Sequence, residues 1–289
     1  PCIPLPEQKQ IARFLDHETG KIDALIEKQQ ALIALLQEKR QAVISHAVTK
    51  GLNPEARMKD SGVEWLGQVP EHWEVSRIKY NSKLTGRIGF RGYTTNDIVD
   101  EGEGAITLSP SNFNGGDLTF KKKTYLSWDK YYESPEIQLK TDDIVMVKTG
   151  STLGKLGYVN RVDEPMTINP QIVVFKGVSL NSIFLFYFLG TPFTQGNVSV
   201  SNTGGTMPTM TQECIGNYFL PLPPEGEQEE IVNRLKVQCA KMDSLISKAE
   251  SAIELMQERR TALISAAVTG KIDVRSWTAP AEPVQEEEV

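Results

Sequence analysis

The sequence predicts an α+β protein in which a mixed α/β domain is inserted between two long helices that pair as an antiparallel coiled coil. Residues 7–49 repeat as residues 227–269 at a constant offset of 220 without a gap, and both copies place apolar residues at steps of three and four. The block between the copies instead alternates short segments rich in Val, Ile, Tyr, Phe and Thr with Gly, Asn, Asp and Pro. That composition is typical of strands joined by turns.

Both copies of the repeat carry residues that mark the ends of helices. A proline cluster precedes each copy, Pro4-Leu5-Pro6 or Pro221-Leu222-Pro223-Pro224, and a glycine, Gly51 or Gly270, follows closely. Proline is tolerated in the first turn of a helix and glycine is favoured just after the last one. Two helices of closely matched length are therefore expected. The paired identities include Glu7/Glu227, Gln8/Gln228, Ile11/Ile231, Leu15/Leu235, Asp23/Asp243, Leu25/Leu245, Ile26/Ile246, Gln37/Gln257, Glu38/Glu258 and Arg40/Arg260.

Each predicted helix carries a narrow apolar seam that needs a partner. Such a seam would stay exposed on an isolated helix, and the other copy is the simplest partner for it. Two unrelated surface helices that pack on the central domain are the alternative, which the constant offset disfavours. We place on the seam Ile11, Leu15, Ile22, Leu25, Leu32, Leu36 and Val43 in the first copy, and Ile231, Leu235, Met242, Leu245, Ala252, Met256 and Leu263 in the second.

The central block contains candidate strands and one strongly apolar helix. The candidate strands are residues 105–108, 143–147, 157–159 and 171–175. Residues 182–189 (SIFLFYFL) are solidly apolar and too short to span a membrane, so they predict a helix buried under the sheet. The chain then divides into residues 1–57 with the first helix, residues 58–222 as the inserted domain, residues 223–277 with the second helix, and residues 278–289 as a disordered acidic tail.

Composition narrows the class of protein. No run reaches the roughly 18 apolar residues of a membrane helix, and the first residues show no secretory pattern, so we expect a cytoplasmic protein. Because the chain starts at Pro1, we interpret it as a fragment or processed piece. Cys2, Cys214 and Cys239 are scattered and lack Cys-x-x-Cys spacing, which disfavours a disulfide framework or a zinc site and predicts buried or inert thiols.

The charge balance argues against a protein that binds nucleic acid alone through bulk positive charge. The net charge is −6 and the pI is about 5.3. Part of the excess lies in the tail, which carries Pro280, Pro283 and the acidic run 286–288. Any binding to nucleic acid is therefore expected to depend on local groups and on partners.

With the repeat and the inserted domain established, the chain resembles the specificity subunit of type I restriction-modification enzymes over nearly its whole length. The resemblance is carried by the helix starts PLPEQKQIARFLD and PLPPEGEQEEIVNRL and by the helix ends QEKRQAVISHAVTKGL and QERRTALISAAVTGKI. The linker MKDSGVEWLGQVPEHWEV and the stretches DDIVMVKTGSTLGKLGYV and GGTMPTMTQECIGNYFLPLP are also similar. Each motif is weak alone, but the set in this order is specific.

The resemblance implies a protein that recognises DNA and performs no chemistry of its own. It implies double-stranded DNA, two methyltransferase subunits and, in the full complex, restriction subunits as partners. The sequence has no convincing glycine-rich cofactor motif and no metal-ligand spacing, so we expect no cofactor and no metal. The helices would fix the separation of two half-sites, and their charged outer faces would dock the methyltransferase subunits. The family typically has two recognition domains, whereas this chain shows one, so it resembles either the second half of a subunit or a half subunit that pairs with itself through the long helices.

Base reading in such a domain is expected from polar side chains that reach the major groove, with Lys, Ser and Thr on phosphates. An ordinary exposed loop residue is the simpler interpretation of any single position. The candidates, all in glycine-rich loops, are Arg87, Arg91, Asn112, Asn114, Lys148, Thr149, Ser151 and Lys155.

Two other functions are alternatives to this one. A phosphate-loop NTPase is suggested by residues 150–155 (GSTLGK), but the loop is one residue short and Leu156 stands where Ser or Thr must bind Mg²⁺. A purely structural coiled-coil adaptor would share the helices and leave the inserted domain without a purpose. Asn169-Pro170-Gln171 only superficially resembles the motif of amino-methyltransferases, since the second proline and the aromatic residue are missing.

Overall fold

The computed structural model describes residues 3–200 and 208–279, so the tail from residue 280 onward and Cys2 lie outside the described residues. The chain forms two compact units, one of Pro1–Arg40 with Gln238–Val289 and one of Gln41–Val237. Two long helices, α1 (Leu5–Lys50) and α7 (Glu225–Val268), each contribute a segment to both units.

The second unit contains the remaining helices and the strands. Its helices are α2 (Ile78–Asn81), α3 (Trp128–Tyr132), α4 (Ser182–Leu189), α5 (Pro192–Val200) and α6 (Gln212–Gly216). The first strands are β1 (Met58–Asp60), β2 (Gln68–Pro70), β3 (Glu74–Arg77), β4 (Lys83–Gly86), β5 (Ile98–Val99), β6 (Gly104–Leu108) and β7 (Phe113–Asn114). The others are β8 (Asp117–Leu118), β9 (Tyr125–Ser127), β10 (Ile144–Val147), β11 (Leu156–Tyr158), β12 (Met166–Ile168), β13 (Ile172–Lys176) and β14 (Phe219–Leu222).

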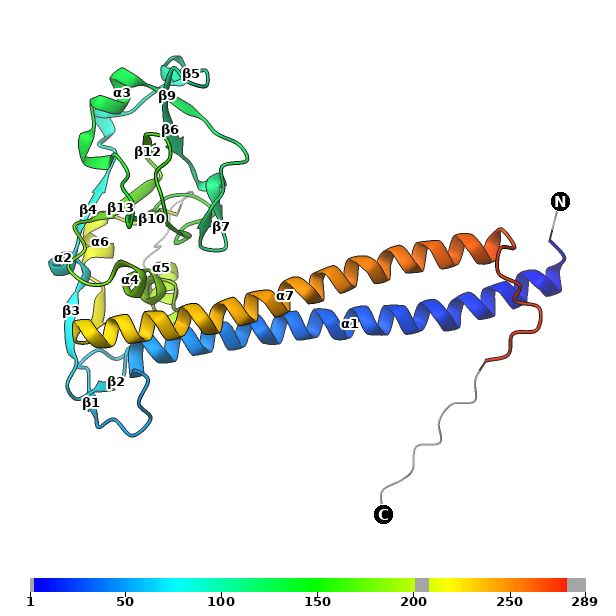
Figure 1. Cartoon of the computed structure of the whole chain (residues 1–289). Coiled ribbons are helices and arrows are strands. Elements are labelled where there is room, and N and C mark those ends of the chain that lie inside the picture. The colour runs from blue at the N-terminus through cyan, green and yellow to red at the C-terminus, as the bar shows by residue number, and fades with distance from the viewer. Residues whose placement is uncertain (1–2, 201–207, 280–289) are drawn as a thin grey trace. The chain divides into compact units, whose positions relative to one another are not determined.

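Within the first unit, α1 and α7 lie side by side and run in opposite directions (Figure 1). Side chains that are buried or half-buried recur at steps of three and four along both helices, which is the spacing of a coiled-coil seam. The seam contains Ile22, Ile26, Ile33 and Leu36 on α1 and, at the constant offset, Met242, Ile246, Ile253 and Met256 on α7. The predicted antiparallel coiled coil is therefore confirmed.

Three of the predicted seam positions are wrong. Leu25 is 50% exposed, Leu32 43% and Leu245 50%. Each is followed by an isoleucine, at 26, 33 and 246, which takes the seam position instead. Successive residues are turned by about 100° around a helix of 3.6 residues per turn, so only one of two apolar neighbours can face the partner. The sequence pattern alone does not decide which one.

Two ion pairs join the helices across the seam. The Arg40 guanidinium Nε lies 3.3 Å from Asp243 Oδ1, and the Arg260 Nε lies 2.9 Å from Asp23 Oδ1. Both Nε atoms are buried and form ion pairs without directed hydrogen bonds through that atom. Because Arg40 and Asp23 correspond to Arg260 and Asp243 in the repeat, the two contacts are the same contact made twice. The helical pair is therefore close to two-fold symmetric.

The glycine signals at the helix ends are confirmed. Gly51 has φ +77° and Gly270 has φ +73°, the left-handed backbone that ends a helix. At Gly51 there is also little room, because a Cβ would lie 3.1 Å from Glu227 Oε1 and 3.3 Å from the Trp73 ring. The chain turns back toward the start of α7 at this point.

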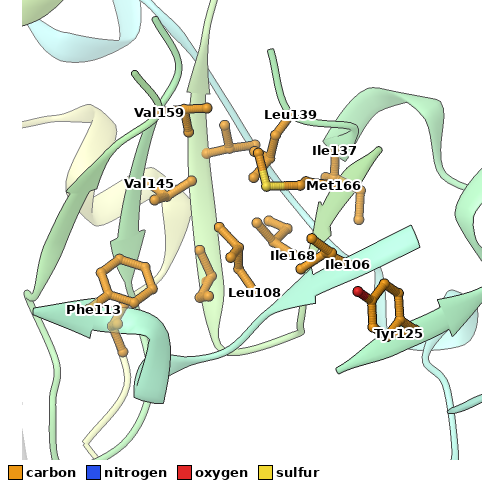
Figure 2. Packing of buried hydrophobic residues seen from close by; sticks show 13 residues of the cluster. Ile106, Leu108, Phe113, Tyr125, Ile137, Leu139, Val145, Val159, Met166 and Ile168 are labelled. Carbon is orange, nitrogen blue, oxygen red and sulfur yellow. The ribbon is translucent and has the colours of Figure 1, made fainter. Parts of the chain in front are cut away.

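Two four-stranded sheets form the centre of the second unit. One has the order β11-β10-β13-β4 and is antiparallel, and the other has the order β12-β6-β9-β5 with β12 and β6 parallel. Figure 2 shows side chains from both sheets meeting in one cluster, among them Leu108, Val145 and Ile168. Their exposed fractions are 0%. This core holds the two sheets together.

The other face of the β10 sheet is covered by short helices. Ile144 and Met146 alternate with the core residues of β10 and are equally buried, as expected when a sheet is covered on both faces. Helix α4 packs on β11 and α6 packs on β4. The helix predicted over residues 182–189 is confirmed with the same bounds, and the four predicted strands correspond to β6, β10, β11 and β13 within one residue at each end.

Hydrogen bonds connect the segment between β2 and β3, and the residue before α4, to the start of α7. The Glu227 carboxylate oxygen Oε2 accepts hydrogen bonds from the buried Trp73 Nε1 at 2.9 Å and lies 2.7 Å from His72 Nε2. Gln228 Oε1 accepts from the Asn181 backbone N–H at 2.8 Å, next to the first turn of α4. Adjacent residues of one helix turn therefore hold two separate elements.

In the part of the chain that the structure describes, no helix is both long and apolar enough to cross a bilayer.

Candidate functional site

A shallow groove of about 440 Å³ opens where β6 and β10 end and β13 begins. It lies between the turn that follows β6, the loop between β10 and β11, and the residue that precedes β13. The residues that line it are Ser109, Pro110, Ser111, Phe113, Thr149, Gly150, Ser151, Thr152, Lys155 and Gln171. Most of them present hydroxyl or amide groups, so the groove is suited to hydrogen bonding.

One wall is the tight loop between β10 and β11. The Gly154 N–H donates to the Val147 carbonyl at 2.8 Å, and the Val147 N–H donates to the Lys155 carbonyl at 2.9 Å. Gly150 and Gly154 have φ of +108° and +85°, which residues with a side chain rarely adopt. The loop is also held from outside, because the Gly150 N–H donates to the Pro208 carbonyl at 2.9 Å. The glycines thus fix where the intervening polar side chains stand.

The opposite wall is a turn held by Asn112. The Asn112 Oδ1 accepts from the Ser109 N–H at 2.9 Å, and its Nδ2 donates to the Thr119 carbonyl at 3.0 Å and the Lys122 carbonyl at 3.2 Å. The next residue, Phe113, is 5% exposed and belongs to the core cluster. Both walls of the groove are therefore anchored in the folded domain.

The groove differs in charge from the protein as a whole. The chain has a net charge of −6, yet none of the described residues that line the groove is acidic, and Lys155 is exposed at its edge. Lys148, at the start of the loop, is half-buried, and burial lowers the pKa of its ammonium group. A neutral-to-positive surface rich in donors favours ligands with anionic or acceptor groups.

Three of the eight predicted site residues, Thr149, Ser151 and Lys155, line this groove together. Lys148 directly precedes them, and its backbone N–H donates to the Gln171 carbonyl at 2.7 Å. Asn114 is exposed on β7, the strand that follows the opposite wall.

The other three predicted residues make internal contacts. Arg87 is 4% exposed, and its guanidinium donates to the Ile168 carbonyl at 3.2 Å and to Thr167 Oγ1 at 3.2 Å. Burial lowers the pKa of this guanidinium. Arg91 is half-buried and its Nη1 lies 3.4 Å from Glu136 Oε1. Asn112 is used in the turn described above.

The prediction missed four polar residues of the groove: Ser109, Ser111, Thr152 and Gln171. Gln171 stands in Asn169-Pro170-Gln171 and at the start of the predicted strand 171–175, and neither pattern marks it as a contact residue. A usable signal was its position directly before a buried strand, because antiparallel pairing of Val147 with Ile172 brings it beside Lys148. That signal needs the strand register, which the sequence does not supply.

The phosphate-loop hypothesis does not fit the geometry of residues 150–155. In a phosphate loop the chain runs from a strand into a helix, whose N-terminal N–H groups bind the phosphates. In this protein the loop joins β10 to the antiparallel strand β11. Within residues 3–200 and 208–279, no cluster of three or more His, Cys, Asp or Glu side chains could hold a metal ion.

Comparison with known proteins gives one family. The family model described as the type I restriction modification DNA specificity domain matches residues 70–255. That match covers most of the inserted domain and much of α7.

Curated relatives match along almost the whole chain. The specificity subunit of the type I restriction enzyme MjaVIII from Methanocaldococcus jannaschii is 26% identical over 281 residues, which are 96% of this chain and 62% of that protein. The EcoBI specificity subunit from Escherichia coli is 24% identical, over 96% of this chain and 59% of its own length. The chain therefore spans about three fifths of the length of these relatives.

Solved structures share the fold. A chain from a type I restriction-modification system studied for complex assembly and conformational transition matches with a TM-score of 0.71 at 17% identity, over 93% of this chain and 61% of that one. The HsdS subunit from Thermoanaerobacter tengcongensis matches with a TM-score of 0.56 at 17% identity, over 94% of this chain and 60% of that one. At these identities the likeness concerns the fold alone.

Proposed function

Because the chain belongs to the family of type I restriction modification DNA specificity domains, we propose that it recognises DNA by sequence within a type I restriction-modification complex. In this proposal residues 58–222 read one half of a bipartite target, and the chain carries out no chemistry itself. The observation that carries the proposal is the groove between the β10–β11 loop and the turn after β6. It gathers hydroxyl groups, an amide and Lys155 without a carboxylate among its described lining residues.

The groove residues suggest a division of labour on DNA. Lys155, Ser151 and Thr149 offer donors suited to phosphate oxygens, which fix position without reading sequence. Asn114, exposed on β7, is suited to a base edge. Lys148 and Arg91 are half-buried and would support contacts at the edge of the surface.

Arg87 and Asn112 take a different part in the proposal. Both are buried, and their polar groups form hydrogen bonds within the domain itself. We assign them to holding the contact surface in shape rather than to touching a base.

The helical pair is proposed as the scaffold for the methyltransferase subunits and, through the complex, for restriction subunits. Its outer faces carry leucines at repeat-related positions: Leu25 and Leu245 are each 50% exposed, Leu35 63% and Leu255 65%. Exposed leucines favour contact with a partner protein over a purely solvated face. Because the leucines repeat at the same offset as the seam, they support two equivalent docking faces and two methyltransferase copies.

The experiment is selection of sequences from a random duplex library by the full chain, at low salt, with and without its methyltransferase subunits. The expected result is a short consensus, bound weakly by the chain alone because of its net charge of −6, and more tightly with methyltransferase present. Failure to enrich any sequence in either condition would contradict the proposal and favour the structural adaptor.

The shape of the consensus answers a second question. A two-fold-symmetric consensus indicates a self-paired half subunit, whereas one side of an asymmetric target indicates part of a two-domain subunit.

A further inference from the structure

Gln171 carries the only side-chain amide among the described residues that line the groove, and it lies in the turn between β12 and β13. It directly precedes β13, is half-buried, and lines the groove beside Gly150, Ser151 and Lys155. On the basis of the proposed DNA-recognition function, we propose that the Gln171 side-chain amide reads an adenine in the major groove and is a specificity-determining residue of this domain.

Hydrogen bonds hold the Gln171 side chain at its oxygen and the Gln171 backbone at its N–H and carbonyl groups. Asn169, 8% exposed, donates from Nδ2 to Gln171 Oε1 at 3.1 Å and accepts on Oδ1 from the Gln171 backbone N–H at 3.0 Å. Asn169 is itself fixed, because its N–H donates to the Leu108 carbonyl of β6 at 2.9 Å. The Gln171 carbonyl accepts from the Lys148 N–H at 2.7 Å. A side chain fixed before binding loses little entropy when it meets its ligand.

The hydrogen-bonding capacity of the Gln171 side chain that no described residue uses is the capacity needed to bind adenine. Among residues 3–200 and 208–279, no acceptor is bound by Gln171 Nε2. Gln171 Oε1 accepts one hydrogen bond, and an amide oxygen has room for two. An amide that donates to adenine N7 and accepts from the adenine N6 amino group makes the paired contact by which glutamine distinguishes adenine from other bases. Guanine presents two acceptors at the same edge and fails to match.

Gly150 lies beside this amide. A Cβ at position 150 would lie 3.5 Å from Gln171 Nε2, in van der Waals contact with the donor. The loop therefore passes beside the amide, and both line the groove. Lys155 and the hydroxyl groups of Ser151 and Thr152, which line the same groove, would meet the backbone of the strand whose base Gln171 reads.

The test compares the sequences selected by the wild-type chain, Gln171→Ala and Gln171→Glu, each as the full chain with methyltransferase subunits and a random duplex library. Gln171→Ala is expected to relax one adenine position, with a loss of preference of about 5- to 100-fold there and little change at the others. Gln171→Glu has two acceptors and no donor, so that position is expected to change toward cytosine, whose amino group donates. Gln68→Ala, an exposed glutamine on β2, is the matched control and should leave the consensus unchanged.

The outcomes separate this inference from the function on which it rests. If the wild-type chain selects no consensus, the proposed function fails. If it selects one that Gln171→Ala leaves intact, only the reading by Gln171 fails. Weaker binding of every sequence alike, with no position relaxed, also overturns the inference, because it indicates a phosphate contact or a structural effect. Equal thermal unfolding midpoints of the variants and wild type exclude loss of the fold as the cause.

Discussion

The two copies of the helical repeat are alike along their seam and different at their first turn. In both, the glutamine near the start donates from Nε2 to a carbonyl five residues earlier, Gln8 to Ile3 at 2.6 Å and Gln228 to Pro223 at 2.8 Å. The glutamate before it behaves differently. Glu227 forms hydrogen bonds with Trp73 and His72, whereas Glu7 accepts no hydrogen bond from residues 3–200 or 208–279.

An indole contacts the N-terminal part of each helix. On α1 it is Trp277, whose ring lies 5.4 Å from Phe14 and 5.3 Å from His17. On α7 it is Trp73, which is fully buried and makes a directed hydrogen bond. The repeat thus encodes how the helices pair, while the segments between and after the copies decide what each helix end holds.

The largest expected effect comes from removing the two indoles. Trp73→Ala should lower the free energy of unfolding by about 3–5 kcal/mol, because it empties a buried site. Trp277→Ala should cost about 1–2 kcal/mol, since its ring is half-buried. Urea unfolding of the full chain followed by circular dichroism measures both. Equal losses would mean that the two helix ends are equivalent, against the difference described above.

A smaller effect separates the two glutamates. Glu227→Ala should cost about 1–3 kcal/mol because the buried Trp73 N–H then lacks an acceptor. Glu7→Ala should stay within about 0.5 kcal/mol of wild type, as for most surface changes. Combining Glu227→Ala with Trp73→Phe, which removes the orphaned donor, should cost less than the sum of the two single losses. Additive losses in that double variant would argue against the hydrogen bond as the source.

The helical pair was largely predictable because the sequence contains two copies of the same helical repeat. The proline and glycine signals located both helices. The residues of the repeat identities Asp23/Asp243 and Arg40/Arg260 form the two ion pairs, Arg40 with Asp243 and Arg260 with Asp23. The seam was predicted only in part. Leu25 and Ile26 are adjacent and equally apolar, and only packing against the partner decides which one is buried.

The candidate site was predictable in location more than in detail. The loop with Thr149, Ser151 and Lys155 stood out because glycines punctuate it, and it does line the groove. Arg87 followed the same reasoning, yet its guanidinium bonds to Ile168 and Thr167, because a strand far along the chain lies beside it. Gln171 was not predicted as a site residue, because no glycine-rich loop surrounds it in the sequence. Its neighbours come from long-range pairing that no local pattern reveals.

The smallest effect tests the symmetry of the pair itself. Each ion pair joins half-exposed groups, for which coupling energies are about 0–1 kcal/mol and fall as salt screens them. Double-mutant cycles on Arg40–Asp243 and on Arg260–Asp23, built from alanine variants, should therefore give couplings that agree within about 0.5 kcal/mol.

Exchanging the charges within each ion pair is a second test of the symmetry between the two contacts. Arg40→Asp alone places two carboxylates together and should destabilise the helices, and adding Asp243→Arg should restore most of the loss. The corresponding exchange at Arg260 and Asp23 should behave in the same way, because the repeat builds both contacts from the same positions. A coupling at one pair and none at the other would show that the symmetry of the sequence does not extend to the energetics of pairing.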